Sequence, residues 1–522
     1  MYCQLDQILT QTASQFPKKI ALDDNKQQVS YEQLELMASQ LATCLIGLDL
    51  AAGSRVAIYL PKQIEAVVTK FAASRAGLVF VPINPLLKPH QVSYILNNCN
   101  VQLLVTSGPR AKQLLEIYPE CNDLQHLLLV DDKFDQKVEN IQLHQWNEQL
   151  TSSAELQSRQ RIDQDLAAIL YTSGSTGNPK GVCLSHRNLI AGAQSVSHYL
   201  KNHHDDVLLA VLPLSFDYGL SQVTTGLLTG AKVVLMEYLL PRDVLRQVEK
   251  HQVTGLAAVP PLWFQLAQLE WPESAKNTLR YITNSGGAMP KATLQALREQ
   301  LPNTKPYLMY GLTEAFRSTY LDPSEIDTRP DSIGKAIPNA QILVCREDGT
   351  ECDAGEIGEL VHRGVHVSLG YWNAPEKTAI RFKPIGRKSN YLTELAVWSG
   401  DQVKKDADGF LYFIGRADDM IKCSGYRISP SELEDTLFLM DGVKEVAALG
   451  VSDEQLGQAV ALLLVVESIT ERDIQKYCLK QLPNYMQPKY IQLVDKLPRN
   501  PNGKIDRKQL KDRYQNLADL TE

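Results

Sequence analysis

Residues 171–181 read YTSGSTGNPKG, a stretch dominated by Gly, Ser and Thr that ends in Pro179-Lys180-Gly181. Apolar runs at 166–170 and 182–184 flank it, so we predict a polar loop between two buried strands. Free backbone N–H groups, hydroxyls and one ammonium are the groups that hold polyphosphate oxygens. A flexible linker would need no Pro-Lys-Gly end, and the spacing of a P-loop is absent. The loop therefore predicts binding of a nucleotide triphosphate in a manner different from that of P-loop NTPases.

A second stretch combines an aromatic ring, a hydroxyl and a carboxylate in the motif Tyr310-Gly-Leu-Thr-Glu314. An aromatic ring can stack on a base, a hydroxyl can reach a phosphate, and a carboxylate can hold Mg²⁺ through oxygen. Upstream, a predicted strand ends in Gly286 and Gly287, where small residues let the backbone approach a planar base. Each residue alone would be an ordinary core or surface residue, but the ordered combination favours a nucleotide site.

A third segment, LSFDYGL at 214–220, follows a predicted strand and carries Phe216 and Asp217. Open α/β sheets bind ligands just beyond the ends of their strands. Asp217 could equally cap a helix or face solvent, and the two interpretations weigh evenly. The segment 257–263 is predicted to run from a strand into a helix with Pro in its first turn, and it would line a pocket or belong to the core.

The elements that must position these motifs alternate between strand-like and helical patterns. Buried runs such as 55–60 and 101–105 are separated by amphipathic stretches, which favours parallel α/β layers. We expect an α/β fold: a large N-terminal domain of layered α/β subdomains plus a small β-rich subdomain, followed by a small α+β C-terminal domain, which the family resemblance given below implies to be mobile. The predicted ranges are 1–415 and 416–522.

Composition limits the class of protein. The 522 residues are 44% hydrophobic and 22% charged, values ordinary for a globular protein. A net charge of −7 argues against a nucleic-acid partner. The sequence predicts neither a signal peptide nor a membrane span. Nine cysteines without metal-binding spacing favour buried free thiols in a reducing compartment, and we expect a cytoplasmic protein.

Taken together, these motifs resemble those of the AMP-forming adenylating enzymes, the superfamily of acyl-CoA synthetases, peptide-synthetase adenylation domains and luciferases. The resemblance covers essentially the whole chain. The sequences of the segments YGLTEAFRSTYL, DSIGKAIPNA and IKCSGYRISPSELE also resemble those of acyl-CoA ligases associated with bacterial exosortase and exopolysaccharide gene clusters.

The resemblance implies roles for individual residues in nucleotide binding. Glu314 would hold Mg²⁺, Asp401 and Arg416 would contact the ribose, and Lys504 in the turn PNGKIDR would bridge the carboxylate and the α-phosphate. Thr172, Lys180, Glu314 and Lys504 would be the catalytic set. The remaining implied contacts to ATP are Ser173, Gly174, Ser175, Thr176, Gly177, Gly286, Gly287, Ala288, Tyr310, Gly311 and Thr313.

For the acid, the resemblance implies a pocket built from Phe216, Asp217, Ser221, Leu262 and Arg317. Amino-acid-activating members use an Asp at the position of Asp217 to pair the substrate ammonium. Arg317 could instead receive a second carboxylate or another anionic group, or it could pair with Asp217. A pair between the two would weaken the argument for an ammonium-bearing substrate.

The resemblance also implies a two-step ligase. A carboxylic acid would attack Mg·ATP to form an acyl-AMP; the C-terminal domain would then rotate about Asp418 and bring Gly425 beside a pantetheine thiol. The acceptor would be coenzyme A, giving an acyl-CoA ligase, or the phosphopantetheine of a separate carrier protein loaded with an amino acid. A non-catalytic nucleotide-binding protein is a third, less favoured reading. The acid, the acceptor and the oligomeric state stay open.

Overall fold

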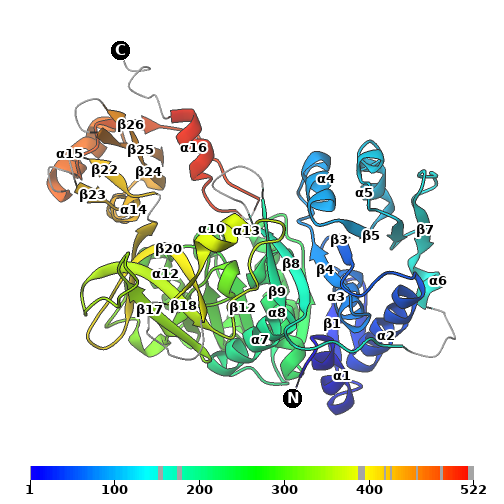
Figure 1. The fold of residues 1–522 in the computed structure, drawn as a ribbon. Coiled ribbons are helices and arrows are strands. Elements are labelled where there is room, and N and C mark those ends of the chain that lie inside the picture. Colours follow the sequence, from blue (N-terminus) through cyan, green and yellow to red (C-terminus); the bar gives the residue numbers. More distant parts are fainter. Residues whose placement is uncertain are drawn as a thin grey trace.

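The computed structural model describes residues 2–150, 157–172, 179–385, 394–416, 419–423, 426–453, 457–482, 486–501 and 503–514. Within these ranges the chain forms three β-sheets covered by helices (Figure 1). Two sheets belong to the large N-terminal part. The third belongs to a small C-terminal part, which lies above the larger one in Figure 1.

The first sheet has seven strands in the order β7-β6-β5-β3-β4-β8-β9. Its neighbouring strands run parallel except at the edge, where β8 and β9 pair antiparallel and flank the predicted phosphate loop. The strands are β3 (Arg55–Tyr59), β4 (Val79–Pro82), β5 (Val101–Thr106), β6 (His126–Leu129), β7 (Gln142–Gln145), β8 (Leu166–Thr172) and β9 (Lys180–Ser185).

The second sheet has fourteen strands and runs through both the nucleotide motifs and the predicted β-rich region. Its central strands β11, β10, β12, β13 and β14 are parallel, and β15 and β16 then continue antiparallel into β21, β20, β18 and β17. The β-rich part therefore extends the α/β sheet. The strands are β1 (Ile20–Asp23), β2 (Gln28–Ser30), β10 (Val207–Ala210), β11 (Lys232–Leu235), β12 (Gly255–Ala258), β13 (Tyr281–Asn284), β14 (Lys305–Tyr310), β15 (Thr319–Leu321), β16 (Ser332–Ala336), β17 (Ala340–Cys345), β18 (Ile357–Gly364), β19 (Phe382–Pro384), β20 (Leu395–Lys405) and β21 (Leu411–Arg416).

The helices of the N-terminal part cover the faces of these sheets. Ser30 begins α2 with a capping box, in which its side chain accepts from the Gln33 N–H and the Gln33 side chain accepts from the Ser30 N–H. The helices and 3₁₀ turns are α1 (Asp6–Gln15), α2 (Tyr31–Gly47), α3 (Ile64–Arg75), α4 (Pro89–Asn98), α5 (Gly108–Gln113), η1 (Tyr118–Glu120), α6 (Trp146–Leu150), α7 (His186–Leu200), α8 (Asp217–Thr229), α9 (Pro241–His251), α10 (Pro260–Ala267), α11 (Glu273–Thr278), α12 (Lys291–Gln300), η2 (Thr313–Ala315), η3 (Pro323–Glu325) and α13 (Pro375–Arg381).

The small C-terminal part is an α+β unit around the third sheet, in which β22, β25 and β24 pair antiparallel and β26 adds in parallel. Ser429 caps its first helix by accepting from the Glu432 N–H. Its elements are β22 (Ile421–Cys423), β23 (Tyr426–Ile428), α14 (Pro430–Phe438), β24 (Val443–Asp453), β25 (Gly457–Val466), α15 (Glu471–Gln481), β26 (Tyr490–Leu493) and α16 (Arg507–Tyr514).

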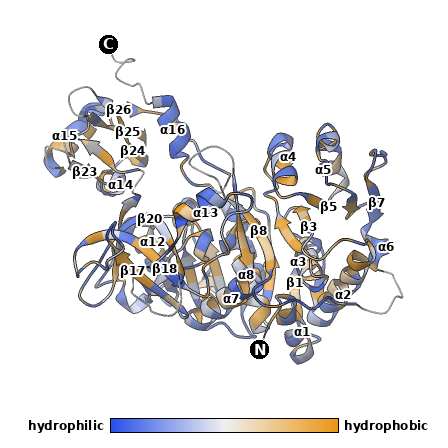
Figure 2. Ribbon diagram, viewed as in Figure 1, coloured by the Kyte–Doolittle hydropathy of each residue, from blue (hydrophilic) through white to orange (hydrophobic). Residues whose placement is uncertain are grey.

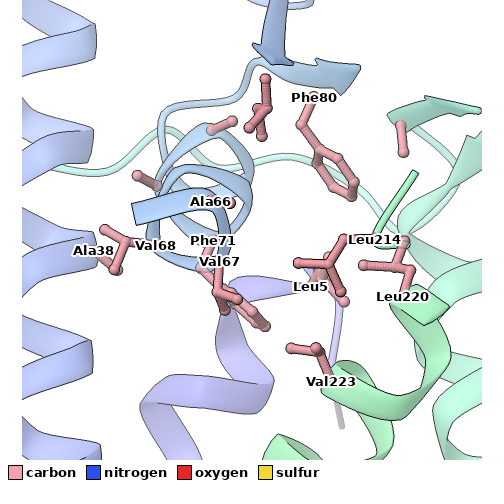
Figure 3. Close-up of a cluster of buried hydrophobic side chains, with 14 of the residues drawn as sticks. Leu5, Ala38, Ala66, Val67, Val68, Phe71, Phe80, Leu214, Leu220 and Val223 are labelled. Atoms are coloured by element: carbon pink, nitrogen blue, oxygen red, sulfur yellow. The ribbon is translucent and has the colours of Figure 1, made fainter. Parts of the chain in front are cut away.

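A buried apolar cluster fixes the segment that carries Phe216 and Asp217. Figure 3 shows Leu214 and Leu220, which bracket that segment, close to side chains of α3 and to Phe80. Figure 2 shows hydrophobic residues concentrated on the strands and hydrophilic ones on outer helices such as α16. Because apolar burial is the main force that orders such a segment, the two leucines hold the intervening residues at the end of β10.

The predicted α/β fold with a large N-terminal and a small C-terminal domain is confirmed. The proposed boundary at 415/416 stays a prediction. In the part of the chain that the structure describes, no helix combines the length and the apolarity that a membrane crossing requires. All nine cysteines are free thiols; seven are buried, whereas Cys3 is exposed and Cys44 is half-buried.

Candidate active site

The predicted phosphate loop leaves the sheet at Thr172 and re-enters it at Lys180, and these two residues are register partners across β8 and β9. Residues 173–178 of the predicted loop lie outside the described residues, among them the predicted ATP contacts Ser173, Gly174, Ser175, Thr176 and Gly177. The Lys180 ammonium lies 5.4 Å from the centre of the Tyr371 ring. Desolvation lowers the pKa of Lys180, and the nearby cations Arg381 and Lys377 lower it further. Lys180 therefore lies in a locally cationic region suited to an anion.

Glu314 lies in η2, next to this cationic region, and is held by Tyr371. The Tyr371 hydroxyl donates to Glu314 Oε1 at 2.5 Å, and burial together with Glu314 raises the pKa of that hydroxyl. Sequence reasoning missed Tyr371, whose only signal is an aromatic residue directly after a glycine in a turn-rich region. No cluster of three or more acidic, His or Cys side chains in the described ranges could hold a metal alone. Mg²⁺ is commonly bound by one or two carboxylates plus substrate phosphates, and Glu314 fits that mode.

Three predicted nucleotide contacts lie together where β14, β20 and β21 meet. The Tyr310 hydroxyl donates to Asp401 Oδ2 at 2.5 Å, and Arg416 Nη1 lies 3.4 Å from Asp401 Oδ1. Asp401 and Arg416 are register partners on adjacent strands. Burial and the Asp401 carboxylate raise the pKa of Tyr310. Tyr310 was expected to offer its ring to adenine; its hydroxyl also fixes the carboxylate predicted to accept the ribose hydroxyls.

The glycines of the predicted base site have different neighbours. Gly286 has a φ of +84°, and a Cβ there would lie 3.3 Å from Lys504 Cε. A Cβ on Gly287 would meet the Pro260 ring at 3.1 Å, whereas Ala288 is exposed. At Gly311 an added Cβ would come within 2.9 Å of the Phe316 carbonyl oxygen. Gly311 therefore makes room for the turn that precedes Arg317, a reason that the sequence did not reveal.

The predicted acid pocket contains a buried ion pair. Arg317 Nη1 lies 2.9 Å from Asp217 Oδ2, and the side chains are 2% and 3% exposed. Thr313 Oγ1 donates to the other carboxylate oxygen at 3.1 Å. Of the alternatives left open for Asp217 and Arg317, mutual pairing is the one present. Both oxygens of Asp217 thus already have partners within the protein.

The other predicted pocket residues divide into two groups. Phe216 precedes α8, and its ring lies 6.0 Å from the Lys504 ammonium. Ser221 lines a buried cavity that Arg317 also lines. Leu262 is 2% exposed on α10 and belongs to the apolar core. The structure therefore places Ser221 and Arg317 on one cavity, Phe216 beside Lys504 and Leu262 in the apolar core, and the pocket roles of these residues stay predictions.

Lys504 reaches this site from the C-terminal part of the chain. It lies in a turn closed by a bridge between Arg499 and Ile505, in which Gly503 adopts a φ of +79°. Asn500 Oδ1 accepts from the Lys504 N–H at 3.1 Å. Desolvation lowers the pKa of the Lys504 ammonium, while the carboxylates of Asp217 and Asp401 raise it. Lys504 therefore lies within electrostatic reach of both the predicted acid pocket and the predicted ribose site.

Contacts between the two parts of the chain support this arrangement. Asn84 Nδ2 donates to the Pro501 carbonyl at 3.3 Å, next to the turn that carries Lys504. Phe264 on α10 and Phe438 on α14 meet edge to face with ring centres 6.4 Å apart. The predicted hinge residue Asp418 and the predicted thiol-tunnel residue Gly425 lie outside the described residues.

Comparison with known families and curated proteins gives consistent matches. A family model described as AMP-binding enzyme matches residues 9–372, and one described as AMP-binding enzyme C-terminal domain matches residues 432–504. The chain is 29% identical to an L-proline–[L-prolyl-carrier protein] ligase of Pseudomonas fluorescens over 96% of this chain and 98% of that protein. It is 28% identical to a long-chain-fatty-acid–CoA ligase of Escherichia coli O157:H7 over 99% and 96%. It is also 27% identical to bacitracin synthase 3 of Bacillus licheniformis over 99% of this chain but only 8% of that protein.

Solved structures show the same architecture. One is an anthranilate CoA ligase in complex with anthranoyl-AMP, with a TM-score of 0.88, 25% identity and coverage of 99% and 98% of the two chains. Another is the o-succinylbenzoate coenzyme A synthetase of Bacillus subtilis in complex with ATP and a magnesium ion, with a TM-score of 0.82, 27% identity and coverage of 97% and 99%.

Proposed function

Because the chain belongs to the AMP-binding enzyme family, we propose that this adenylate-forming enzyme is an acyl-CoA ligase. It would activate a carboxylic acid with Mg·ATP and transfer the acyl group to the thiol of coenzyme A. The observation that carries the adenylation step is the approach of the Lys504 ammonium to the pocket residue Phe216. None of the relatives named above is described as an exosortase-associated ligase. The narrower likeness to those ligases therefore rests on the sequence motifs alone and is part of this proposal.

In the first step, a carboxylate oxygen of the acid attacks the α-phosphorus of ATP, and the bond to the β-phosphate oxygen breaks. Pyrophosphate leaves, and the acyl-AMP anhydride keeps the adenosine. Lys504 would neutralise the charge that builds on the α-phosphate and the incoming carboxylate, and Lys180 would receive the phosphates at the loop. Glu314, oriented by Tyr371, would hold Mg²⁺, whose bound charge offsets that of the phosphates.

In the second step, the thiol attacks the acyl carbonyl carbon, the bond to the AMP oxygen breaks, and AMP leaves. The thiol proton passes to solvent or to the leaving phosphate. We propose that the C-terminal domain rotates about Asp418 for this step, withdraws Lys504 and brings Gly425 beside the thiol, because a few residues suffice for such a hinge.

We favour coenzyme A over a carrier-bound amino acid because both carboxylate oxygens of Asp217 already have partners within the protein. An ammonium on the acid would need a free carboxylate, but Asp217 is already paired by Arg317 and Thr313. Placing a second cation beside Arg317 would also add like-charge repulsion in a buried site. Loading of a separate carrier protein with an amino acid is the alternative, supported by the prolyl-carrier ligase among the relatives.

Acid-dependent exchange of labelled pyrophosphate into ATP tests the first step. A panel of fatty, aryl, hydroxy and amino acids is offered to the wild type and to Lys504→Ala. Exchange that needs an acid and falls about 100- to 1,000-fold in the variant supports adenylation through Lys504. Exchange with amino acids alone, followed by transfer to a carrier protein rather than to coenzyme A, would replace the proposal by its alternative. No exchange with any acid would refute both.

A further inference from the structure

The backbone just before Arg317 adopts an uncommon conformation. Phe316 has a φ of +59° and a ψ of −78°, outside the regions that non-glycine residues ordinarily occupy. Its ring is 1% exposed, and a Cβ on the neighbouring Gly192 would come within 2.4 Å of it. Strained backbone persists where the surroundings fix it and is concentrated at functional sites. Here the turn directs Arg317 into the interior of the pocket wall.

Arg317 lines a cavity of about 30 Å³ between α7, α8 and the parallel strands β12, β13 and β14. A cavity needs about 10–15 Å³ of such volume to hold one water, so this one has room for roughly two waters or a polar group of similar size. Its wall is mainly apolar, with Val196, Leu208 and Met309 among the lining side chains. Asp217, the ion-pair partner of Arg317, directly follows Phe216, whose ring lies 6.0 Å from the Lys504 ammonium, and this links the cavity wall to the proposed reaction site.

Four polar atoms on the lining side chains have no hydrogen-bond partner among the described residues. Arg317 contributes two donors, Nε and Nη2, while Gln222 contributes the acceptor Oε1 and Thr225 contributes its hydroxyl. All three residues are more than nine-tenths buried. Leaving such groups unpaired costs about 1–3 kcal/mol each, so the cavity is built to receive a ligand that both accepts and donates hydrogen bonds.

The charge at the cavity restricts that ligand further. Asp217 and Arg317 cancel each other, so a second carboxylate would bury a net negative charge in an apolar wall, and an ammonium would face the guanidinium. A hydroxyl adds no charge, accepts from Arg317 and donates to Gln222 Oε1. We propose, resting on the adenylation function above, that Arg317 is a specificity-determining residue that selects short acids carrying a hydroxyl on the acyl chain.

Matched acid pairs test this inference. Acid-dependent pyrophosphate exchange is measured with 3-hydroxybutyrate against butyrate and with lactate against propionate, and with succinate, alanine and decanoate for comparison. A hydrogen bond to a charged group is worth about 1.5–3 kcal/mol, so kcat/KM for at least one hydroxy acid should exceed that of its partner by at least about tenfold. In Arg317→Met this ratio should fall to about one, and Gln222→Leu should reduce it in the same direction.

Two controls separate the possible failures. The double variant Asp217→Asn/Arg317→Gln removes both charges together, so that no buried charge is left unpaired. If Arg317→Met does not fold, the kcat/KM ratio of the matched acids is measured in this double variant, where it should also fall. Arg298→Met alters an arginine that pairs with Asp327 and does not line the cavity, and it should leave the ratio as in the wild type. Exchange that favours butyrate, succinate or alanine, or a ratio unchanged in Arg317→Met, would overturn the inference and leave adenylation intact. If no acid supports exchange, calorimetric binding of 3-hydroxybutyrate and butyrate decides: equal affinities would overturn the inference independently of turnover.

Discussion

The buried pair between Asp217 and Arg317 should make the stability of the N-terminal domain strongly non-additive. The perturbation is a double-mutant cycle of Asp217→Ala, Arg317→Met and the double variant. Each side chain is at most 3% exposed, and the two atoms that carry the pair are 2.9 Å apart. Either single substitution therefore leaves one buried charge without its partner.

The expected magnitude follows from that burial. Breaking one side of a buried pair typically costs about 3–5 kcal/mol, because the remaining charge is desolvated and uncompensated. The double variant loses both charges together with the Thr313 hydrogen bond to the Asp217 carboxylate, a bond to a charged group worth about 1.5–3 kcal/mol that Asp217→Ala loses as well. We expect it to be no less stable than either single variant, so that the coupling energy is at least about 3 kcal/mol.

Urea unfolding followed by tryptophan fluorescence measures the four free energies of unfolding. A matched cycle of Arg298→Met and Asp327→Ala supplies the control, because that pair is similarly close, at 2.6 Å, but its side chains are 34% and 72% exposed. The control coupling should stay within about 1 kcal/mol. If the buried cycle is additive to within about 0.5 kcal/mol, the pair does not hold in solution and the reasoning about the acid pocket is wrong.

Three further outcomes are expected. Lys504→Arg should move the alkaline limb of exchange activity to higher pH: the ammonium is lost as pH rises through a pKa that desolvation holds below the ordinary 10.5, whereas arginine stays charged, and a pH–rate profile checks this. Tyr371→Phe should raise the KM for Mg·ATP about tenfold or more through the lost hydrogen bond to Glu314, measured by steady-state kinetics. Burial lowers the pKa of Lys70 to about 7, so between about pH 7 and 10.5 the unfolded chain binds one more proton than the folded chain. The free energy of unfolding therefore rises with pH across that window. Lys70→Met should reduce this rise, as measured by urea unfolding at pH 7 and pH 9.

An unchanged alkaline limb in Lys504→Arg would place the titrating group elsewhere. A KM for Mg·ATP that is indifferent to Tyr371→Phe would remove the tyrosine from the nucleotide site. Equal slopes of stability against pH in the wild type and Lys70→Met would mean that the buried amine keeps its ordinary pKa in the folded chain. Glu325→Gln, in a 3₁₀ turn where Glu325 pairs with Arg329, is the comparison for the two kinetic experiments, because no role in the nucleotide site is predicted for Glu325.

Local sequence signals were sufficient for most of the fold. The helix that follows Ser30 and the one that follows Ser429 begin as their capping residues indicate, because a cap is decided by neighbours a few positions away. The strands on either side of the phosphate loop follow from their apolar runs. The roles of all the predicted site residues stay predictions, and Ser173 to Gly177, Asp418 and Gly425 also lie outside the described residues.

Long-range pairing is what the sequence could not provide. Arg317 and Asp217 are 100 positions apart, and nothing local to either indicates which of several partners it takes. The contact between Tyr371 and Glu314 spans 57 positions and was missed entirely. The conformation of Phe316 was also hidden, because it depends on the space that Gly192 and Gly311 leave around it. These contacts depend on tertiary packing, which overrides local preference.

Lys504 belongs to the C-terminal part of the chain, so its effective concentration at the proposed site depends on how that part is positioned. In the proposed mechanism, the ammonium would act as a tethered reagent, available only in the fraction of molecules whose C-terminal domain is docked. Docking rests partly on small contacts such as Asn84 with Pro501 and Phe264 with Phe438. Residues that never contact the substrate can therefore set the rate of the first step. The observed rate is the rate of the docked state multiplied by the fraction of molecules in that state.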